Sequence, residues 1–148
     1  KNKGSKIIFE PGRFIIGNAA ILITKIIYIK KSNNKYFIIL DAGMNNLMRP
    51  ALYNAHHQII PLRKTNKLLK GKLEFVGPVC ESSDKFLTQK RFSQIKEGDY
   101  VSLSNVGAYG MSLSSNYNTR PIIAEIMVNG SKHYIIRKRQ SLENLVNN

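Results

Sequence analysis

Cys80 and Glu81 are the adjacent residues in this chain best suited to acid–base chemistry, and they follow a Gly77–Pro78 pair. Proline cannot donate to a strand ladder and restricts the residue before it, so this pair should end the apolar segment 73–76 and begin a loop. Functional side chains concentrate on such loops. A thiol beside a carboxylate can exchange a proton near neutral pH when its pKa is tuned. The alternative is a cysteine that packs as a small apolar group.

Two other stretches carry residue types that suit anion binding. Glu10–Pro11–Gly12–Arg13 lies between an expected strand and an expected helix, where backbone N–H groups and an arginine suit a phosphate. The alternative there is an ordinary strand-to-helix turn. Arg49 and Tyr53 are four residues apart, which places them on one face of a helix. Without other context, this pair reads as a solvated arginine and a packed tyrosine.

The adjacent His56 and His57 do not predict a metal site. Neighbouring residues on a strand point to opposite faces, so the two rings cannot easily share one ion. No cluster of cysteine and histidine with ligand spacing accompanies them. We therefore expect no metal.

The composition is that of one ordinary domain, with 148 residues of which 43% are hydrophobic. The single cysteine excludes an internal disulfide and indicates a reducing, cytoplasmic location. No apolar run reaches the roughly 18 residues of a membrane span, so we expect no membrane partner. The net charge of +14 favours anionic partners. The basic residues are nevertheless scattered, and Arg137–Lys138–Arg139 is short for a nucleic-acid arm, so we expect no nucleic acid.

Hydrophobic patterning and turn signals predict a mainly β fold, a β-barrel or sandwich from residue 21 onward. Strands are expected at 6–9, 21–30, 36–40, 58–61, 73–76, 100–106, 122–128 and 133–137. Helices are expected at 14–20, within 44–55 and at 141–146. Segment 63–72 is interpreted as a basic polar connection, and segment 85–95 as an irregular or partly helical excursion.

Four stretches, taken together and in this order, resemble the diaminopimelate decarboxylase family and cover nearly the whole chain. They are Glu10–Pro11–Gly12–Arg13, the segment 41–53 with its DAGMN and RPALY motifs, the segment 77–82 (GPVCES), and the segment 107–121 with GAYG and SNYNTRP. The resemblance implies an enzyme of fold type III that depends on pyridoxal 5'-phosphate (PLP). In that family a (β/α) barrel precedes a C-terminal β domain. Residues 1–20 would then be the last strand and helix of the barrel, and residues 21–148 the β domain.

The resemblance implies which residues contact the cofactor. Glu10 would pair with the pyridine nitrogen of PLP, which strengthens the ring as an electron sink. Gly12 and Arg13 would lie at the cofactor phosphate, and Arg13 would also reach a substrate carboxylate. Tyr109, in the GAYG motif, would contact both the cofactor phosphate and the substrate.

The resemblance also implies the residues that act on the substrate. Arg49 and Tyr53 would bind it, the arginine offering a fork for a carboxylate. Cys80 would protonate the carbanion that remains after CO₂ departs, and Glu81 would bind the ammonium at the distal end. In the family this cysteine loop enters the active site of the other subunit, which implies a homodimer with shared active sites.

The implied function is PLP-dependent decarboxylation of meso-2,6-diaminopimelate to L-lysine and CO₂. Glu81 favours this branch, because ornithine decarboxylases of the same fold tend to carry an aspartate after the cysteine. Three alternatives stay open: an ornithine or arginine decarboxylase-like enzyme, a basic β domain that binds nucleic acid, and a non-catalytic interaction module. None of the 16 lysines lies in a motif matching the lysine that holds PLP, so we expect a C-terminal piece that is inactive alone.

Overall fold

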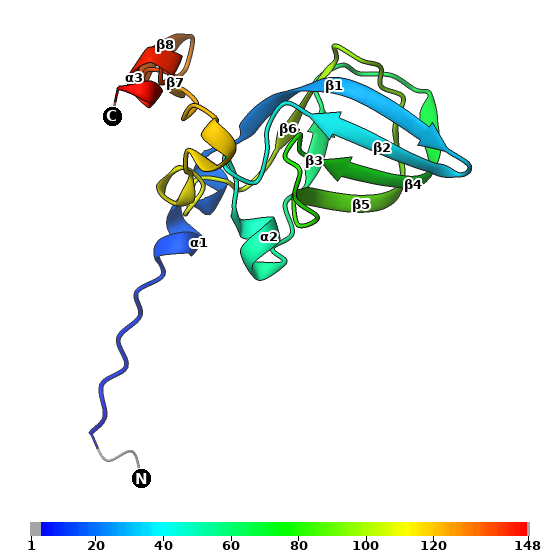
Figure 1. Ribbon diagram of the computed structural model, residues 1–148. Helices are drawn as coiled ribbons and strands as arrows, with labels where there is room; N and C mark the ends of the chain where they lie inside the picture. Colours follow the sequence, from blue (N-terminus) through cyan, green and yellow to red (C-terminus); the bar gives the residue numbers. More distant parts are fainter. Residues whose placement is uncertain (1–3, 148) are drawn as a thin grey trace.

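The structure is a computed structural model that describes residues 4–147, and it consists mainly of β-strands (Figure 1). Six strands form a nearly closed, barrel-like sheet in the order β3-β6-β1-β2-β4-β5, and β7 and β8 form a separate hairpin. The strands are β1 (Leu22–Ser32), β2 (Lys35–Leu40), β3 (Ile59–Pro61), β4 (Leu68–Val76), β5 (Lys85–Ser93), β6 (Tyr100–Leu103), β7 (Glu125–Asn129) and β8 (Lys132–Arg137). The helices are α1 (Gly12–Ile16), α2 (Arg49–Tyr53) and α3 (Leu142–Val146), with 3₁₀ turns η1 (Gly17–Ala19), η2 (Met111–Leu113) and η3 (Tyr117–Thr119).

The β1–β2 hairpin begins the barrel and sets its inner face. Ser32 pairs with Lys35 across a two-residue turn in which Asn33 takes a φ of 52°, a conformation that asparagine tolerates. Along the first half of β1 the side chains alternate between buried and exposed, as a half-buried strand requires. β2 then pairs in parallel with β4, so that Ile38 lies beside Phe75. This crossover places β4, the strand that leads into the Cys80 loop, between β2 and the edge strand β5.

The core fills the inside of the barrel with aliphatic and aromatic side chains from every strand of the sheet. Ile26, Ile38 and Phe75 are completely buried. The ring of Phe75 packs edge to face on Phe92 of β5, with the ring centroids 5.0 Å apart. Each such side chain contributes roughly 1.5–3 kcal/mol through removal from water. This packed core makes the barrel a stable scaffold for the loops at its end.

Most predicted elements are confirmed, with ends shifted by a few residues. These are the strands at 21–30, 36–40, 58–61, 73–76 and 100–106, the hairpin of 122–128 and 133–137, and the helices at 14–20, within 44–55 and at 141–146. The predicted hairpins correspond to β1–β2 and β7–β8. β4 ends at Val76, directly before the Gly77–Pro78 pair, as expected of proline.

Three predictions were wrong. Residues 6–9 form no strand, because no strand among the described residues pairs with them, and they lie exposed. The segment 85–95 is not partly helical: residues 85–93 form β5, which pairs with β4 and buries Phe86 and Phe92. The segment 63–72 is not wholly a connection, since β4 already begins at Leu68. Lys70 and Lys72 occupy its exposed face, which made the strand look polar.

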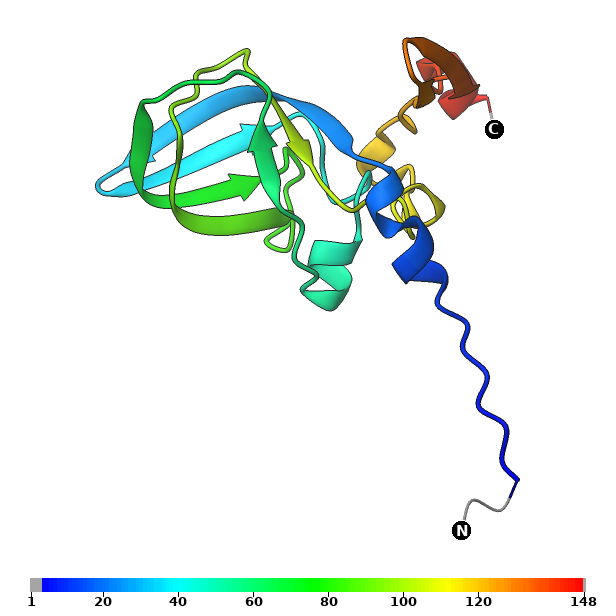
Figure 2. The ribbon, with the colours of Figure 1, turned by 180° about the vertical axis from the view of Figure 1, so that it is seen from behind.

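α1, α2 and the loop that follows β6 lie at one end of the barrel (Figures 1 and 2). Residues 4–11 extend away from this end, and the β7–β8 hairpin with α3 lies apart from the barrel in both views. The chain fixes this end by backbone hydrogen bonds, from Val106 to Ala20 (3.1 Å) and from Gly107 to Gly17 (2.9 Å). Within residues 4–147, no helix has both the length and the apolar character needed to cross a membrane.

Candidate functional site

Arg49 lies against two tyrosines, which we call, together with it, the arginine–tyrosine group (Arg49, Tyr53, Tyr109). The Cζ atom of Arg49 is 5.6 Å from the ring centroid of Tyr53 and 5.5 Å from that of Tyr109. Both distances allow a cation–π contact, worth about 0.5–1 kcal/mol at an exposed site. Tyr53 and Tyr109 are 61% and 51% exposed, so both residues are accessible to a ligand. The helical spacing of Arg49 and Tyr53 is confirmed, and Tyr109 joins them from a distant loop.

Two glycines hold Tyr109 in place. A Cβ on Gly107 would overlap the carbonyl oxygen of Ile16, and one on Gly110 would overlap that of Val106. The loop can therefore approach α1 and turn back on itself only with glycine at both positions. Tyr109 itself has a φ of 61°, in the left-handed region that costs a non-glycine residue about 1–2 kcal/mol. Such strain is common at functional sites.

Arg13 and Arg49 both act on a buried histidine beside this group. His57 is 1% exposed, and its Nδ1 lies 2.9 Å from the carbonyl oxygen of Ser104. Burial holds the pKa of His57 below its usual value, and the hydrogen bond to Ser104 opposes this shift. The positive charges of Arg49 and Arg13 contribute smaller effects that also lower this pKa. The two arginines thus create a positive potential at this end of the barrel.

Gly12 and Arg13 are the first residues of α1, and Glu10 lies two residues before it. The N–H of Gly12 donates to the carbonyl oxygen of Glu10 (2.9 Å), and all three residues are exposed. Arg13 therefore presents its guanidinium at the surface, close enough to His57 to affect its pKa.

The cysteine loop (residues 77–84) is fixed by the carboxylate of Asp84. The N–H of Val79 donates to Oδ2 (2.8 Å), and the N–H of Met44 donates to Oδ1 (2.7 Å). The N–H of Gly77 donates to the Asp84 carbonyl oxygen (2.9 Å). Asp84 is 3% exposed, and burial raises the pKa of its carboxyl although these N–H bonds oppose the shift. A buried carboxylate with two backbone donors is a strong local clamp.

This clamp leaves Cys80 and Glu81 at the surface. Cys80 is a free, exposed cysteine, so the alternative in which it packs as a small apolar group is wrong. Glu81 is also exposed, and the hydroxyl of Tyr117 donates to its Oε2 at 3.4 Å. The loop therefore offers a thiol and a carboxylate side by side to whatever approaches it.

Arg120 ties the SNYNTRP segment to the loop after β2. Its Nη2 donates to the carbonyl oxygen of Asp41 and lies 3.6 Å from the Asp41 carboxylate. The positive charge of Arg120 also lowers the pKa of Asp84, though less than burial raises it. This segment thereby supports the cysteine loop from one side.

Sequence reasoning did not assign a role to Asp84, His57, Tyr117 or Arg120. Each acts through a contact with a residue distant in the chain, and only the fold reveals such contacts. The one local signal was a carboxylate a few residues after a Gly–Pro turn, which is a common way to close a loop.

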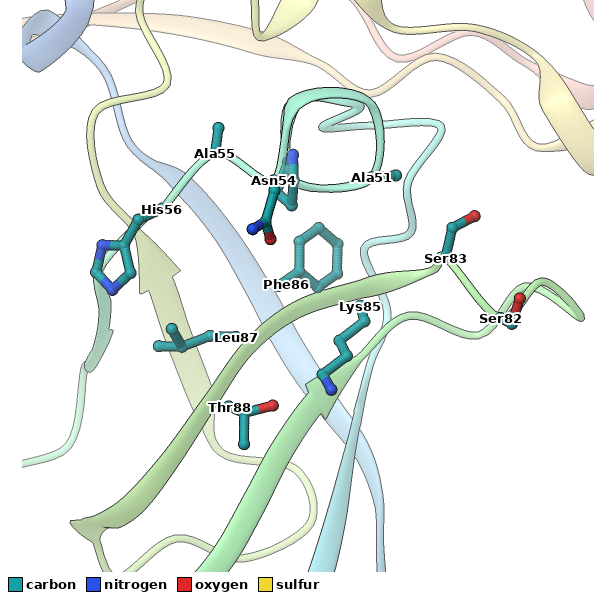
Figure 3. A pocket seen from close by; sticks show the side chains of 11 residues that line it. Ala51, Asn54, Ala55, His56, Ser82, Ser83, Lys85, Phe86, Leu87 and Thr88 are labelled. Atoms are coloured by element: carbon teal, nitrogen blue, oxygen red, sulfur yellow. The ribbon is translucent and has the colours of Figure 1, made fainter.

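Within residues 4–147, no hydrogen bond or ion pair joins Cys80 or Glu81 to a member of the arginine–tyrosine group. A hollow of about 610 Å³ is bordered by α2 and the residues after it on one side and by Ser82, Ser83 and β5 on the other. Figure 3 shows Lys85, Leu87 and Thr88 along the strand side and Asn54 on the opposite side. None of the predicted site residues lines this hollow.

The family described as "Pyridoxal-dependent decarboxylase, C-terminal sheet domain" matches residues 13–107. This chain therefore belongs to the pyridoxal-dependent decarboxylases, as a member of their C-terminal sheet domain.

Relatives within that class include diaminopimelate decarboxylases, to whose C-terminal third the chain is homologous. It is 48% identical to that of Vibrio cholerae over 145 residues and 44% identical to that of Aquifex aeolicus over 146 residues. These matches cover 98% and 99% of this chain, but only 34% of each relative. The chain thus spans about a third of the length of these relatives.

Solved structures support the same relationship. The diaminopimelate decarboxylase of Helicobacter pylori complexed with L-lysine is 42% identical, with a TM-score of 0.83, over 91% of this chain and 33% of that one. The arginine decarboxylase of Paramecium bursaria Chlorella virus has a TM-score of 0.66 at 17% identity, over 72% of this chain and 30% of that one, which shows a shared fold alone.

Proposed function

We propose that this chain is the C-terminal part of an enzyme that decarboxylates meso-2,6-diaminopimelate to L-lysine and CO₂. The observation that carries the proposal is the display of Cys80 and Glu81 on a loop clamped by Asp84, in a chain 48% identical to a diaminopimelate decarboxylase. A loop held this firmly has the preorganisation that a proton donor needs. The exposed free thiol also supports the expected cytoplasmic location, since such thiols persist in reducing compartments.

We further propose that residues 1–20 are the end of a (β/α) barrel and that residues 21–148 are the β domain. In the complete protein, residues 6–9 would gain a neighbouring strand from the barrel. Their exposed apolar side chains, Ile7, Ile8 and Phe9, support this division, because burying them against such a neighbour is favourable. The barrel would also supply the lysine that holds the cofactor.

The residues of α1 and Tyr109 fit the PLP phosphate. Arg13 is an exposed cation at the start of a helix, Gly12 leaves its backbone accessible, and Tyr109 offers a hydroxyl. Glu10 supplies a carboxylate for the pyridine nitrogen. When bound, PLP accepts the electron pair of the bond that releases CO₂.

The substrate is bound and protonated by the remaining residues. Arg49 binds a carboxylate through its guanidinium, and Tyr53 adds one hydroxyl contact. The carboxylate of Glu81 pairs with the distal ammonium. As the bond to CO₂ breaks, the Sγ–H of Cys80 gives its proton to the carbon that lost the carboxylate, and the resulting thiolate regains a proton from water.

We propose that the active site is shared between two subunits of a homodimer. The contacts of residues 4–147 support this, because none of their hydrogen bonds or ion pairs joins Cys80 or Glu81 to the arginine–tyrosine group of the same chain. The cysteine loop of one subunit would then meet Arg49 and Tyr109 of the second.

The experiment is a substrate comparison on the completed protein, in which this chain follows its upstream barrel. CO₂ release is measured from meso-diaminopimelate and from L-ornithine, for the wild type and for Glu81→Gln. We expect a clear preference for meso-diaminopimelate and a rise of about tenfold or more in its KM in the variant, because a charged partner is lost. A preference for L-ornithine would contradict the proposed substrate.

A further inference from the structure

His57 is a buried polar residue that the proposed function leaves unused. A carbonyl oxygen can only accept, so the 2.9 Å contact with Ser104 requires the proton to be on Nδ1. The neutral ring then carries a lone pair on Nε2. This Nε2 is fully buried and has no hydrogen-bond partner among the described residues.

Within residues 4–147, Arg49 has a buried donor that lacks an acceptor, just as His57 has a buried acceptor that lacks a donor. Its Nε–H, which can only donate, is likewise buried without a partner among the described residues. The Ala55 N–H donates to the Arg49 carbonyl oxygen (3.3 Å), which brings the segment leading into His57 back to Arg49. The loop after Ser104, to which His57 bonds, carries Tyr109, whose ring centroid is 5.5 Å from the Arg49 Cζ, so both contacts place Arg49 and His57 in one region. Buried donors and acceptors in native proteins are almost always paired, either directly or through an ordered water. The acceptor His57 Nε2 and the donor Arg49 Nε–H, both unpaired in the described part of the chain, are therefore best explained as partners of each other.

The backbone shows why His57 is suited to hold Arg49. Ser104 at the end of β6 accepts from His57, and its own N–H donates to the carbonyl oxygen of Gln58 (2.9 Å). The histidine is thereby fastened to the barrel. Arg49, in contrast, begins a helix of only five residues, whose end is marked by an Ala55 N–H bond to the Arg49 carbonyl oxygen (3.3 Å). An acceptor fixed in this way can set the orientation of the Arg49 guanidinium.

We propose that His57 is a positioning residue for Arg49, whose Nε–H is joined to the His57 Nε2 through one bridging water. The bridge holds one edge of the guanidinium, so that its Nη atoms remain free to bind a carboxylate beside Tyr53 and Tyr109. That the bound anion is the substrate carboxylate rests on the proposed function. The benefit is preorganisation of Arg49 before the substrate arrives.

The test uses two substitutions in the completed protein. In His57→Asn the amide nitrogen can still donate to Ser104, but nothing accepts at the position of Nε2. In His57→Gln the longer side chain can place an oxygen near the position of Nε2, while the donor to Ser104 is lost. We expect the KM for meso-diaminopimelate to rise about tenfold in His57→Asn, with little change in kcat, and to stay near the wild-type value in His57→Gln.

Thermal stability should follow the opposite order, with His57→Gln the less stable variant because it loses the Ser104 bond. If His57 had only a structural role, KM would change together with stability, or in neither variant. Either of those results would overturn the proposal.

A spectroscopic readout is independent of activity. In ¹⁵N spectra of the ligand-free wild type, His57 should show protonated Nδ1 and unprotonated Nε2. The Arg49 Nε–H signal, assigned with Arg49→Lys, should shift in His57→Asn and much less in His57→Gln. A proton on Nε2, or an Arg49 signal unaffected by His57→Asn, would refute the bridge. If the wild type failed to decarboxylate meso-diaminopimelate while these spectra held, only the proposed function would fail.

Discussion

At the scale of single residues, the cysteine loop depends on the absence of one side chain. The carboxyl group of Asp84 lies where a Cβ on Gly77 would stand. Glycine is needed at this position because the carboxylate must come close to reach the N–H groups of Val79 and Met44. The Gly77–Pro78 pair therefore ends β4, and its glycine leaves room for the Asp84 carboxylate that holds the loop.

Gly77→Ala should destabilise the protein by about 1–3 kcal/mol, because the added methyl group forces the Asp84 carboxyl away. Urea unfolding checks this value. Gly17→Ala is a matched control, since its Cβ would meet only Arg13 Cγ at 3.9 Å, an ordinary contact. Equal stability of the two variants would contradict the role given to Gly77.

The pH dependence of stability should report on His57. Its pKa is lower in the folded state than its value of 6.5 in the unfolded chain, so the unfolded state binds more protons. The contribution of neutral His57 to the free energy of unfolding is complete above pH 6.5, and it is lost as the pH falls through the pKa of His57 in the folded state. Melting temperatures between pH 8 and pH 5 should therefore fall more in the wild type than in His57→Gln. Parallel pH curves for the two proteins would contradict this account.

At the scale of elements, some strands could be predicted and others could not. The alternation of apolar and polar residues and the turn residues between them were sufficient to predict β1 and β2, because a short turn sets the pairing of these two strands. Segment 85–93 has too few regularly spaced apolar residues to identify a period, and its pairing with β4 decides its conformation. The lysines of β4 concealed a strand that is apolar on one face only.

The same limit applies to the candidate site. The spacing of Arg49 and Tyr53 indicated a shared helical face, because that relation is local. Their contact with Tyr109 requires the loop after β6 to return to α2, and the family resemblance was the only signal for it. The clamp by Asp84 and the burial of His57 arise from tertiary packing and have no periodic signature.

Phe92→Ala should destabilise the protein by about 3–5 kcal/mol, because β5 buries this ring against Phe75 inside the barrel. Phe14→Ala is the control: that ring is 85% exposed, and the change should stay within about 0.5 kcal/mol in this chain. Denaturant unfolding compares them. A small effect at Phe92 would contradict the strand assignment of β5.

At the scale of the whole molecule, the basic residues that give the net charge of +14 are scattered along the chain, and some of them pair with acidic side chains. Glu74, which is buried, contacts the amino groups of Lys35 and Lys72 at 3.2 Å each and that of Lys85 at 3.6 Å. Their amino groups compensate the buried carboxylate of Glu74 and so stabilise the sheet locally. These three lysines therefore have a charged partner within the sheet itself.

The shared active site predicts that two inactive proteins can complement each other. Mixed subunits of the completed protein, one carrying Cys80→Ala and the other Arg49→Ala, should form heterodimers with one intact site. After random exchange, activity should recover to roughly a quarter of the wild-type value, because half of the dimers are mixed and each has one working site. Lack of recovery, with subunit exchange confirmed by mass spectrometry, would contradict sharing.

The central claim is that Cys80 donates the proton in the decarboxylation of meso-diaminopimelate. Its most direct test is CO₂ release from this substrate by the completed protein and by its Cys80→Ala variant, with bound PLP followed by absorbance. We predict that the variant binds PLP normally and loses activity by a factor of about 10²–10⁴, the usual contribution of a general acid. Unchanged turnover in Cys80→Ala, or none in the PLP-loaded wild type, would contradict the claim.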